Sequence, residues 1–207
     1  ILAEKRTGDN INMRRDDVNK SFSQAMDIFK EEEVELVMHA GDGMNFWGYK
    51  HPSYFNFYME QVKKITENNI RYFEISGNHN FAKKKGVGCE LEKLNFLPNA
   101  KTFYDGKYEL HEIKGTNIVL HALPSALDKE KFTEEFYKIK KIPGKFNILM
   151  SHCGLSNIEF YAKSSSSIVL HFEEIIKKEM DLVLLGDYHH YKQVHHNIFY
   201  PGPTERF

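Results

Sequence analysis

The sequence has little of several features that mark particular classes of protein. It holds 2 cysteines in 207 residues, Cys89 and Cys153, and neither lies in a zinc-binding spacing or a disulfide framework. This usage suits a reducing compartment, so we expect a cytoplasmic protein. No apolar run approaches the length of a membrane-spanning helix, and no signal peptide is visible, so we expect no membrane partner.

An excess of charge of either sign is also missing. Lys and Arg number 28 against 29 acidic residues, which gives a formal net charge of -1. Because no global basic field draws in nucleic acid, any contact with DNA must use a local patch. What the chain does have is apolar material, with 41% hydrophobic residues including 16 Phe and 11 Tyr. That is enough for a bulky core in one domain over residues 1–207.

Apolar periodicity predicts an alternation of helices and strands. We expect helices at 16–33, 53–67, 88–95, 130–138 and 171–179, and strands at 35–40, 71–75, 146–151 and 182–186. Residues 101–123 are typical of two or three antiparallel strands, and 194–200 of a last strand or hairpin. The aromatic-rich segment 46–58 is interpreted as partly core; the alternative is an exposed patch for a partner subunit.

Four of these strands end in short polar clusters. The clusters are Gly41-Asp42, Gly77-Asn78-His79-Asn80, Ser151-His152 and Gly186-Asp187-Tyr188-His189. Apolar runs of this length, with helices between them, predict parallel strands of an α/β sheet. The carboxyl ends of such strands converge on one crevice, so we expect these polar side chains to meet.

Each candidate residue has a structural alternative. Asp42 lies between glycines and is as typical of a helix cap as of a ligand. A lone buried histidine such as His152 is more often a core residue, but its position at a strand end favours a ligand. Asp187 and His189 lie two apart, so in an extended segment both project to the same side. The Asn78-His79 pair favours coordination and proton chemistry over simple turn formation.

The residue types indicate a particular metal chemistry. Carboxylate, carboxamide and imidazole without thiolate suit Mn²⁺, Fe or Zn. There are more ligands than one tetrahedral ion uses. Two ions about 3.5–4 Å apart, bridged by a carboxylate, commonly hydrolyse phosphoesters. Asp42 is the natural bridge, and His79 the natural acid for the leaving oxygen.

The clusters resemble the ordered motifs of calcineurin-like metallophosphoesterases, and within them the SbcD-type nucleases related to the meiotic recombination eleven nuclease. The matching segments are Gly41-Asp42-Gly43-Met44-Asn45, Gly77-Asn78-His79-Asn80, Ser151-His152, in part Gly186-Asp187-Tyr188-His189, and the ending Tyr200-Pro201-Gly202-Pro203-Thr204-Glu205-Arg206. The resemblance implies two mixed β-sheets flanked by helices, a four-layer α-β-β-α sandwich. It also implies a metal-dependent phosphodiesterase that hydrolyses DNA, as an exonuclease or endonuclease, in double-strand break repair and recombination.

Residue roles and partners follow from the same resemblance. Asp42 would bridge two divalent ions, with Mn²⁺ expected first and Mg²⁺, Fe or Zn as alternatives. Asn78, His152 and Asp187 would hold the second ion, His189 the first, and His79 would be the transition-state acid. The implied partners are DNA, an SbcC-like ATPase subunit and a second copy of the chain, with the homodimer contact placed on helix 54–65.

The chain departs from the family pattern at three places. Asp187 stands where the family usually has His. Asn80 replaces the acidic partner of the catalytic histidine. The first motif, Asp-x-His, is absent, and we expect the domain to be incomplete at both ends.

Two other functions stay open on the sequence alone. One is a phosphatase or cyclic-diester phosphodiesterase on the same scaffold, which the near-neutral charge favours slightly. The other is a non-catalytic subunit that keeps the fold and has lost a metal. The run Lys83-Lys84-Lys85 fits contact with a phosphate backbone as well as it fits a solvated loop.

Overall fold

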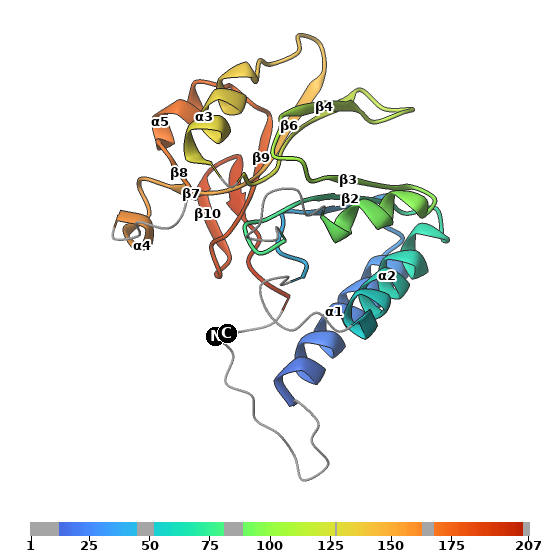
Figure 1. Ribbon diagram of the computed structural model, residues 1–207. Helices are drawn as coiled ribbons and strands as arrows, with labels where there is room; N and C mark the ends of the chain where they lie inside the picture. The colour runs from blue at the N-terminus through green and yellow to red at the C-terminus, as the bar shows by residue number, and fades with distance from the viewer. Residues whose placement is uncertain (1–12, 45–51, 81–88, 127, 163–167, 205–207) are drawn as a thin grey trace.

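Helices and strands alternate along the chain as the periodicity predicted. The computed structural model describes residues 13–44, 52–80, 89–126, 128–162 and 168–204 (Figure 1). In chain order the elements are α1 (Met13–Glu31), β1 (Leu36–His39), α2 (Pro52–Thr66), β2 (Arg71–Ile75), the 3-10 helix η1 (Glu90–Phe96), β3 (Ala100–Phe103), β4 (Glu109–Glu112), β5 (Ile118–Leu123), α3 (Lys129–Lys138), β6 (Phe146–His152), β7 (Gly154–Leu155), α4 (Glu159–Ala162), β8 (Val169–Leu170), α5 (Phe172–Ile176), β9 (Leu182–Gly186), β10 (Lys192–His195) and β11 (Ile198–Tyr200).

The strands form two main sheets. The first has the order β1-β2-β3, and all of its strands are parallel. The second has the order β10-β11-β9-β6-β5-β4, with parallel pairs in the middle and antiparallel pairs at both edges. The short strands β7 and β8 form a separate parallel pair. The carboxyl ends of β1, β2, β6 and β9 carry the four polar clusters.

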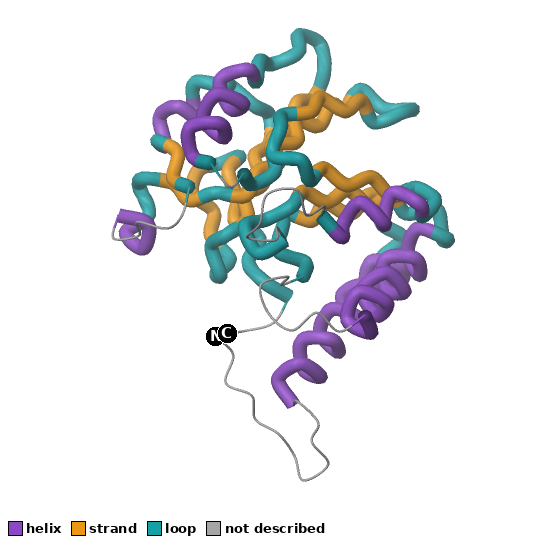
Figure 2. The backbone as a smooth tube through the Cα atoms, in the orientation of Figure 1, coloured by secondary structure: helices purple, strands orange, loops and turns teal. Residues whose placement is uncertain are grey.

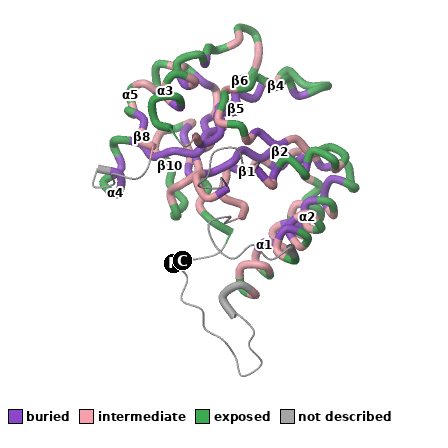
Figure 3. Tube along the Cα trace, in the orientation of Figure 1, coloured by how far each residue is buried: buried purple, intermediate pink, exposed green. Residues whose placement is uncertain are grey.

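The two sheets pack face to face, with helices on the outside (Figures 1 and 2). Side chains alternate along β2: Tyr72 joins the cluster that contains residues of α1 and α2, whereas Phe73 and Ile75 face the second sheet. In β6, Leu149 packs toward α3 and α5, and Met150 packs toward the first sheet. This alternation produces two outer cores and one core between the sheets, and the strands are the most buried part of the chain (Figure 3). The predicted α-β-β-α sandwich is confirmed.

The prediction for residues 101–123 was wrong in one respect. β4 and β5 form the expected antiparallel hairpin, with its turn at Lys114-Gly115-Thr116. Residues 100–103, however, pair in parallel with β2 in the other sheet. Local turn signals cannot reveal this pairing, because the two partners are joined through η1 and not through a turn. The predicted ending at 194–200 is a hairpin of β10 and β11.

Helix α2 places its apolar stripe inside the molecule. Tyr58, Val62 and Ile65 are buried in the same cluster as residues of α1 and β2. Of the aromatic-rich segment 46–58, Phe55 and Tyr58 are buried, so the interpretation as partly core holds for residues 53–58, whereas residues 46–51 lie outside the described residues. The homodimer contact on this helix stays a prediction. None of the helices in the described ranges is long and apolar enough to cross a membrane.

Several predicted features lie outside the described residues. They are Asn45 of the second motif, the lysines at 83–85, the end at 205–207, and the start at residues 1–12.

Candidate metal centre

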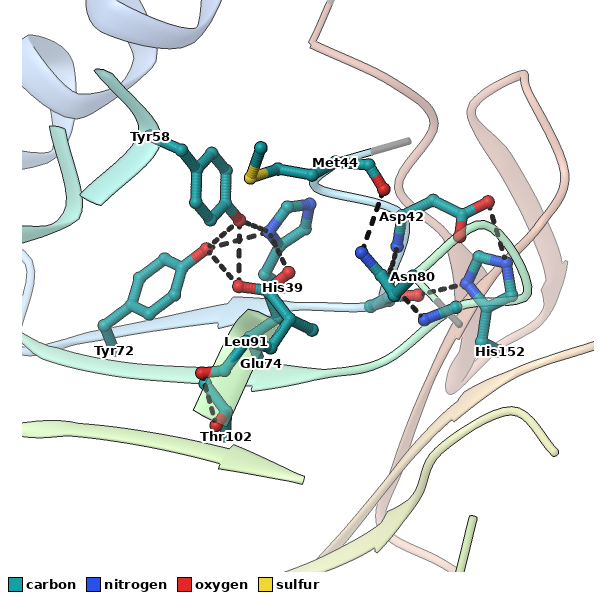
Figure 4. Close-up of polar contacts among 12 residues, drawn as sticks. His39, Asp42, Met44, Tyr58, Tyr72, Glu74, Asn80, Leu91, Thr102 and His152 are labelled. Carbon is teal, nitrogen blue, oxygen red and sulfur yellow. Dashed lines mark hydrogen bonds and ion pairs between the residues drawn. The ribbon is translucent and has the colours of Figure 1, made fainter. Parts of the chain in front are cut away.

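Four side chains from separate strand ends meet around one nitrogen atom. His152 Nε2 lies 3.1 Å from Asn78 Oδ1, 3.3 Å from Asp42 Oδ2 and 3.8 Å from Asp187 Oδ1. These residues follow or end β2, β6, β1 and β9, so both sheets contribute. The predicted convergence is present for these four residues, and Figure 4 shows the Asp42 carboxylate facing the His152 ring.

The loop that carries Asp42 is held tightly against the loop after β2. Asp42 has a φ of 60°, a conformation that non-glycine residues rarely adopt and that often marks functional sites. Its Oδ1 accepts a hydrogen bond from the His79 backbone N–H at 2.9 Å. A Cβ atom at Gly77 would lie 2.0 Å from Asp42 Oδ1, so only glycine permits this approach. Asp42 is thus positioned by the second loop and does not cap a described helix.

The hydrogen bonding of His152 fixes which of its nitrogens faces the acidic groups. Nδ1 lies 2.7 Å from the carbonyl oxygen of Ala40, and a carbonyl can only accept, so Nδ1 carries a hydrogen. In the neutral ring, Nε2 then presents a lone pair to three oxygen atoms. That arrangement is unfavourable unless Nε2 binds a proton or all four groups share a cation. The same backbone contact is the kind that orients metal-binding histidines.

The electrostatics of the pair agree with this geometry. Burial alone would raise the pKa of Asp42, but the His152 imidazole lowers it below its ordinary range. Burial alone would lower the pKa of His152, but Asp42 and then Asp187 raise it above its ordinary value. His152 is 3% exposed and Asp42 20% exposed, so the negative charge lies partly open to incoming ions while the imidazole is enclosed.

This donor set fits a divalent cation. One imidazole, one amide oxygen and two carboxylates are the ligand types that Mn²⁺, Fe and Zn accept. In the described ranges, no group of three or more His, Cys, Asp and Glu side chains is placed to hold a metal ion as it stands. Asp42, Asn78, His152 and Asp187 are the side chains that would hold an ion here.

The segment after β9 differs from the expected one. Asp187 has a φ of 83°, so it is not extended, and the argument from strand alternation does not place Asp187 and His189 on one side. Asp187 is partly buried and points at His152, whereas His189 is exposed. The role of His189 as a ligand of a first ion stays a prediction.

Asn80 connects the two loops and does not take the place of an acidic partner for His79. Its Oδ1 accepts hydrogen bonds from Gly77 N at 2.7 Å and Asp42 N at 3.1 Å, and its Nδ2 donates to Met44 O at 2.9 Å. The side chain is buried and all of its hydrogen-bonding groups are engaged within the loops. The interpretation of Asn80 as a weakened partner for the His79 ring is therefore replaced by a structural role.

Sequence reasoning missed two buried groups near the centre. Tyr161 lies beside Asp187, and burial together with that carboxylate raises the pKa of its hydroxyl. Glu74, inside the apolar run of β2, is fully buried with Tyr58, Tyr72 and His39 (Figure 4). The signal for Glu74 was a carboxylate within a run that otherwise reads as a buried strand; nothing in the sequence pointed to Tyr161.

Comparison with known proteins identifies the family. The calcineurin-like phosphoesterase family matches residues 8–191. The chain belongs to this family, whose members use divalent metals, and it is a phosphoesterase-type hydrolase by descent.

Two curated relatives share the name "DNA double-strand break repair protein Mre11". The one from Sulfurisphaera tokodaii is 27% identical over 155 residues, covering 72% of this chain and 38% of the relative. The one from Methanocaldococcus jannaschii is 28% identical over 157 residues, covering 71% of this chain and 40% of the relative. The chain thus spans about two fifths of the length of these relatives. The predicted resemblance to the Mre11 and SbcD group is confirmed.

A solved structure shares the fold. It matches with a TM-score of 0.53 and 11% identity, covering 89% of this chain and 86% of that chain. At this identity the match shows the fold alone.

Proposed function

We propose that this protein is a metal-dependent nuclease that hydrolyses DNA phosphodiester bonds, of the SbcD type, in double-strand break repair. The observation that carries the proposal is the meeting of Asp42, Asn78 and Asp187 around His152 Nε2. The name that the two relatives share supports DNA as the substrate.

The chain's own residues divide the work. Asn78, His152 and Asp187 would hold one ion, His189 would hold a second, and Asp42 would bind both, with Mn²⁺ as the expected metal. Bound divalent ions supply Lewis-acid polarisation of the phosphoryl oxygens. His79, next to Asn78 and tied to Asp42 through its backbone, would give a proton to the leaving oxygen.

We extend the proposal to partners and location. An SbcC-like ATPase subunit and a second copy of the chain are expected partners by analogy with the relatives. A cytoplasmic location fits the two free, buried thiols of Cys89 and Cys153.

The direct test is cleavage of linear duplex and single-stranded DNA by the full chain, with Mn²⁺ and with EDTA. We expect Mn²⁺-dependent cleavage, lowered by about 10²–10⁴-fold in His79→Gln, with Mn²⁺ affinity retained because His79 is not a ligand. Faster turnover of an aryl phosphate than of DNA would select a phosphatase. Tight Mn²⁺ binding with no hydrolysis of either substrate would select a non-catalytic subunit.

A further inference from the structure

A second buried polar cluster lies beside the metal centre, on the helix side of the first sheet. We call it the Glu74 cluster; it consists of His39 of β1, Tyr58 of α2, and Tyr72 and Glu74 of β2 (Figure 4). Tyr58 and Tyr72 each contact Glu74 Oε2, at 2.8 and 3.1 Å. The two hydroxyls lie 2.8 Å apart, and His39 Nδ1 lies 2.9 and 2.8 Å from them.

Counting hydrogens shows that the cluster lacks donors when Glu74 is ionised. The four side chains make five close contacts, and each contact needs one hydrogen. Each tyrosine hydroxyl supplies one, and a neutral His39 supplies at most one at Nδ1. A proton on Glu74 adds a further donor, so the neutral acid satisfies the cluster better than the carboxylate.

The surroundings of Glu74 favour the same form. The side chain is fully buried, and its Oε1 has no hydrogen-bond partner among the described residues. In the same ranges no Lys or Arg pairs with it; its nearest basic group is His39 Nδ1, at 3.5 Å. A buried carboxylate with one oxygen unpaired is costly.

The titration of both groups is shifted toward neutrality. Burial raises the pKa of Glu74 to about 8, although the hydrogen bonds from Tyr58 and Tyr72 lower it. Burial lowers the pKa of His39 to about 4, although Asp42 raises it. The titratable groups that face Glu74 are His39, Asp42, Tyr58, Tyr72 and Cys89.

The cluster supports the loop that carries Asp42. A Cβ atom placed on Gly43 would lie 2.1 Å from Tyr58 Oη and 2.7 Å from Glu74 Oε1. The backbone of Gly43, next to Asp42, therefore lies close to the Tyr58 hydroxyl and the Glu74 carboxyl group. His39 lies at the end of β1, three residues before Asp42. The cluster therefore holds this loop in two ways, through His39 in the preceding strand and through the close approach of Tyr58 and Glu74 to Gly43.

We propose that Glu74 is a positioning residue for the metal centre: as a neutral carboxylic acid it completes the buried cluster and so holds Asp42 in its ligating conformation. The proposal rests on the proposed function only in taking Asp42 as a metal ligand. It predicts that the hydrogen-bonding shape of the side chain at 74 matters, and that its negative charge does not.

The test compares Mn²⁺ affinity by titration calorimetry at pH 6.5 in the parent and three variants. Glu74→Gln keeps the shape of the neutral acid, whereas Glu74→Ala removes it. Thr102→Val is the matched control, because Thr102 Oγ1 donates to Leu91 O in a buried position of the same sheet. We expect Glu74→Gln and Thr102→Val within about threefold of the parent, and Glu74→Ala weaker by about 10–100-fold, as for other residues that orient ligands.

A second measurement needs no metal. The carboxyl carbon resonance that disappears in Glu74→Gln should titrate in the parent with a midpoint near pH 8. A midpoint in the ordinary range of glutamate would overturn the proposal. So would a Glu74→Gln variant that binds Mn²⁺ as weakly as Glu74→Ala, or a Glu74→Ala variant that binds as tightly as the parent.

These outcomes separate the two proposals. A parent protein that binds no Mn²⁺ refutes the metal centre and, with it, the role of Glu74. A parent that binds Mn²⁺, with variants that do not follow the expected order, refutes the role of Glu74 alone.

Discussion

Two histidines, the buried His121 and the partly buried His39, lie in strands of the two sheets and make different networks. His121, in β5, accepts at Nδ1 from Tyr108 at 2.9 Å and donates from Nε2 to Asn147 Oδ1 at 2.9 Å. Asn147 also donates to the carbonyls of Ile142 and Lys145, and its backbone N–H donates to the Asp181 carboxylate, which pairs with Lys141, so every polar group finds a partner. The cluster of His39 holds a carboxyl group with an unpaired oxygen.

The positions of the two networks explain the contrast. Asn147 lies near the start of β6, at the opposite end of that strand from His152. There a fully satisfied network only has to join the strand to the loop before it. The Glu74 cluster lies at the ends of β1 and β2, where the left-handed Asp42 also sits. Incomplete hydrogen bonding is thus found at the end that carries the candidate metal centre, as expected if function and not stability selected it.

The strongest way to sharpen this contrast is Asp42→Asn. Asparagine keeps an acceptor for the His79 N–H and tolerates a φ of 60°, but it removes the charge that would bridge the ions. We expect Mn²⁺ affinity and DNA cleavage to fall by at least about 10³-fold, while the free energy of unfolding of the metal-free protein changes by only about 1 kcal/mol. Calorimetry, a cleavage assay and denaturant unfolding measure the three quantities. Retained Mn²⁺ binding would contradict the assignment of Asp42.

The opposite pattern, a loss of stability without a loss of activity, is expected for Asn147→Ala, at the other end of β6 from His152. The variant leaves His121 Nε2–H and the Ile142 N–H without their acceptor. We expect a loss of about 3 kcal/mol in the free energy of unfolding, with Mn²⁺ affinity and turnover of the folded protein unchanged. Asn68→Ala serves as control. The exposed Asn68 side chain, just after α2, donates one hydrogen bond to Lys64 O, so its removal should cost less than about 0.5 kcal/mol in the free energy of unfolding. A loss of activity larger than the loss of folded protein would contradict the view that the Asn147 network serves stability and not the candidate metal centre.

The smallest expected effect is in the pH dependence of stability. The pKa of Glu74 is raised from 4.5 to about 8, so its contribution is fully present below pH 4.5 and is lost as the pH rises through 8. The pKa of His39 is lowered from 6.5 to about 4, so its contribution is present above pH 6.5 and is lost as the pH falls. The two slopes oppose each other between pH 4.5 and 6.5, and Glu74 acts alone above 6.5.

The variant Glu74→Gln isolates this effect. The stability of the parent relative to the variant should fall between pH 6.5 and 8 by at most about 1.4 kcal/mol per pH unit. Denaturant unfolding of both proteins across this range measures the difference. A constant difference would show that Glu74 does not titrate there.

Much of the fold was predictable, because its signals are local. The apolar runs before Asp42, Asn78, His152 and Asp187 gave the strands, and the rule that strand ends converge brought those four residues together. The two-sheet arrangement came from the family resemblance. The parallel pairing of residues 100–103 with β2 was not predictable from turns, since it joins segments across the fold.

The details of the centre were less predictable, because they depend on backbone conformation and on neighbours distant in sequence. The positive φ of Asp187 invalidated an argument that assumed an extended chain. Asn80 was assigned to His79 by analogy, whereas the backbone groups of both loops occupy its side chain. Glu74 was missed although it is a carboxylate in an apolar run, and its partner on α2 could be known only from the packing of that helix.

The bond from His152 Nδ1 to Ala40 O has a consequence for the whole sandwich. The His152 ring belongs to β6 of one sheet, and the Ala40 carbonyl directly follows β1 of the other sheet. An ion bound at Nε2, on the opposite side of the imidazole, would therefore strengthen or weaken this contact between the two sheets. Ion binding and the packing of the two sheets against each other would then be thermodynamically linked. Chelation should then speed amide exchange along the ends of β1 and β6, in the absence of any nucleic acid.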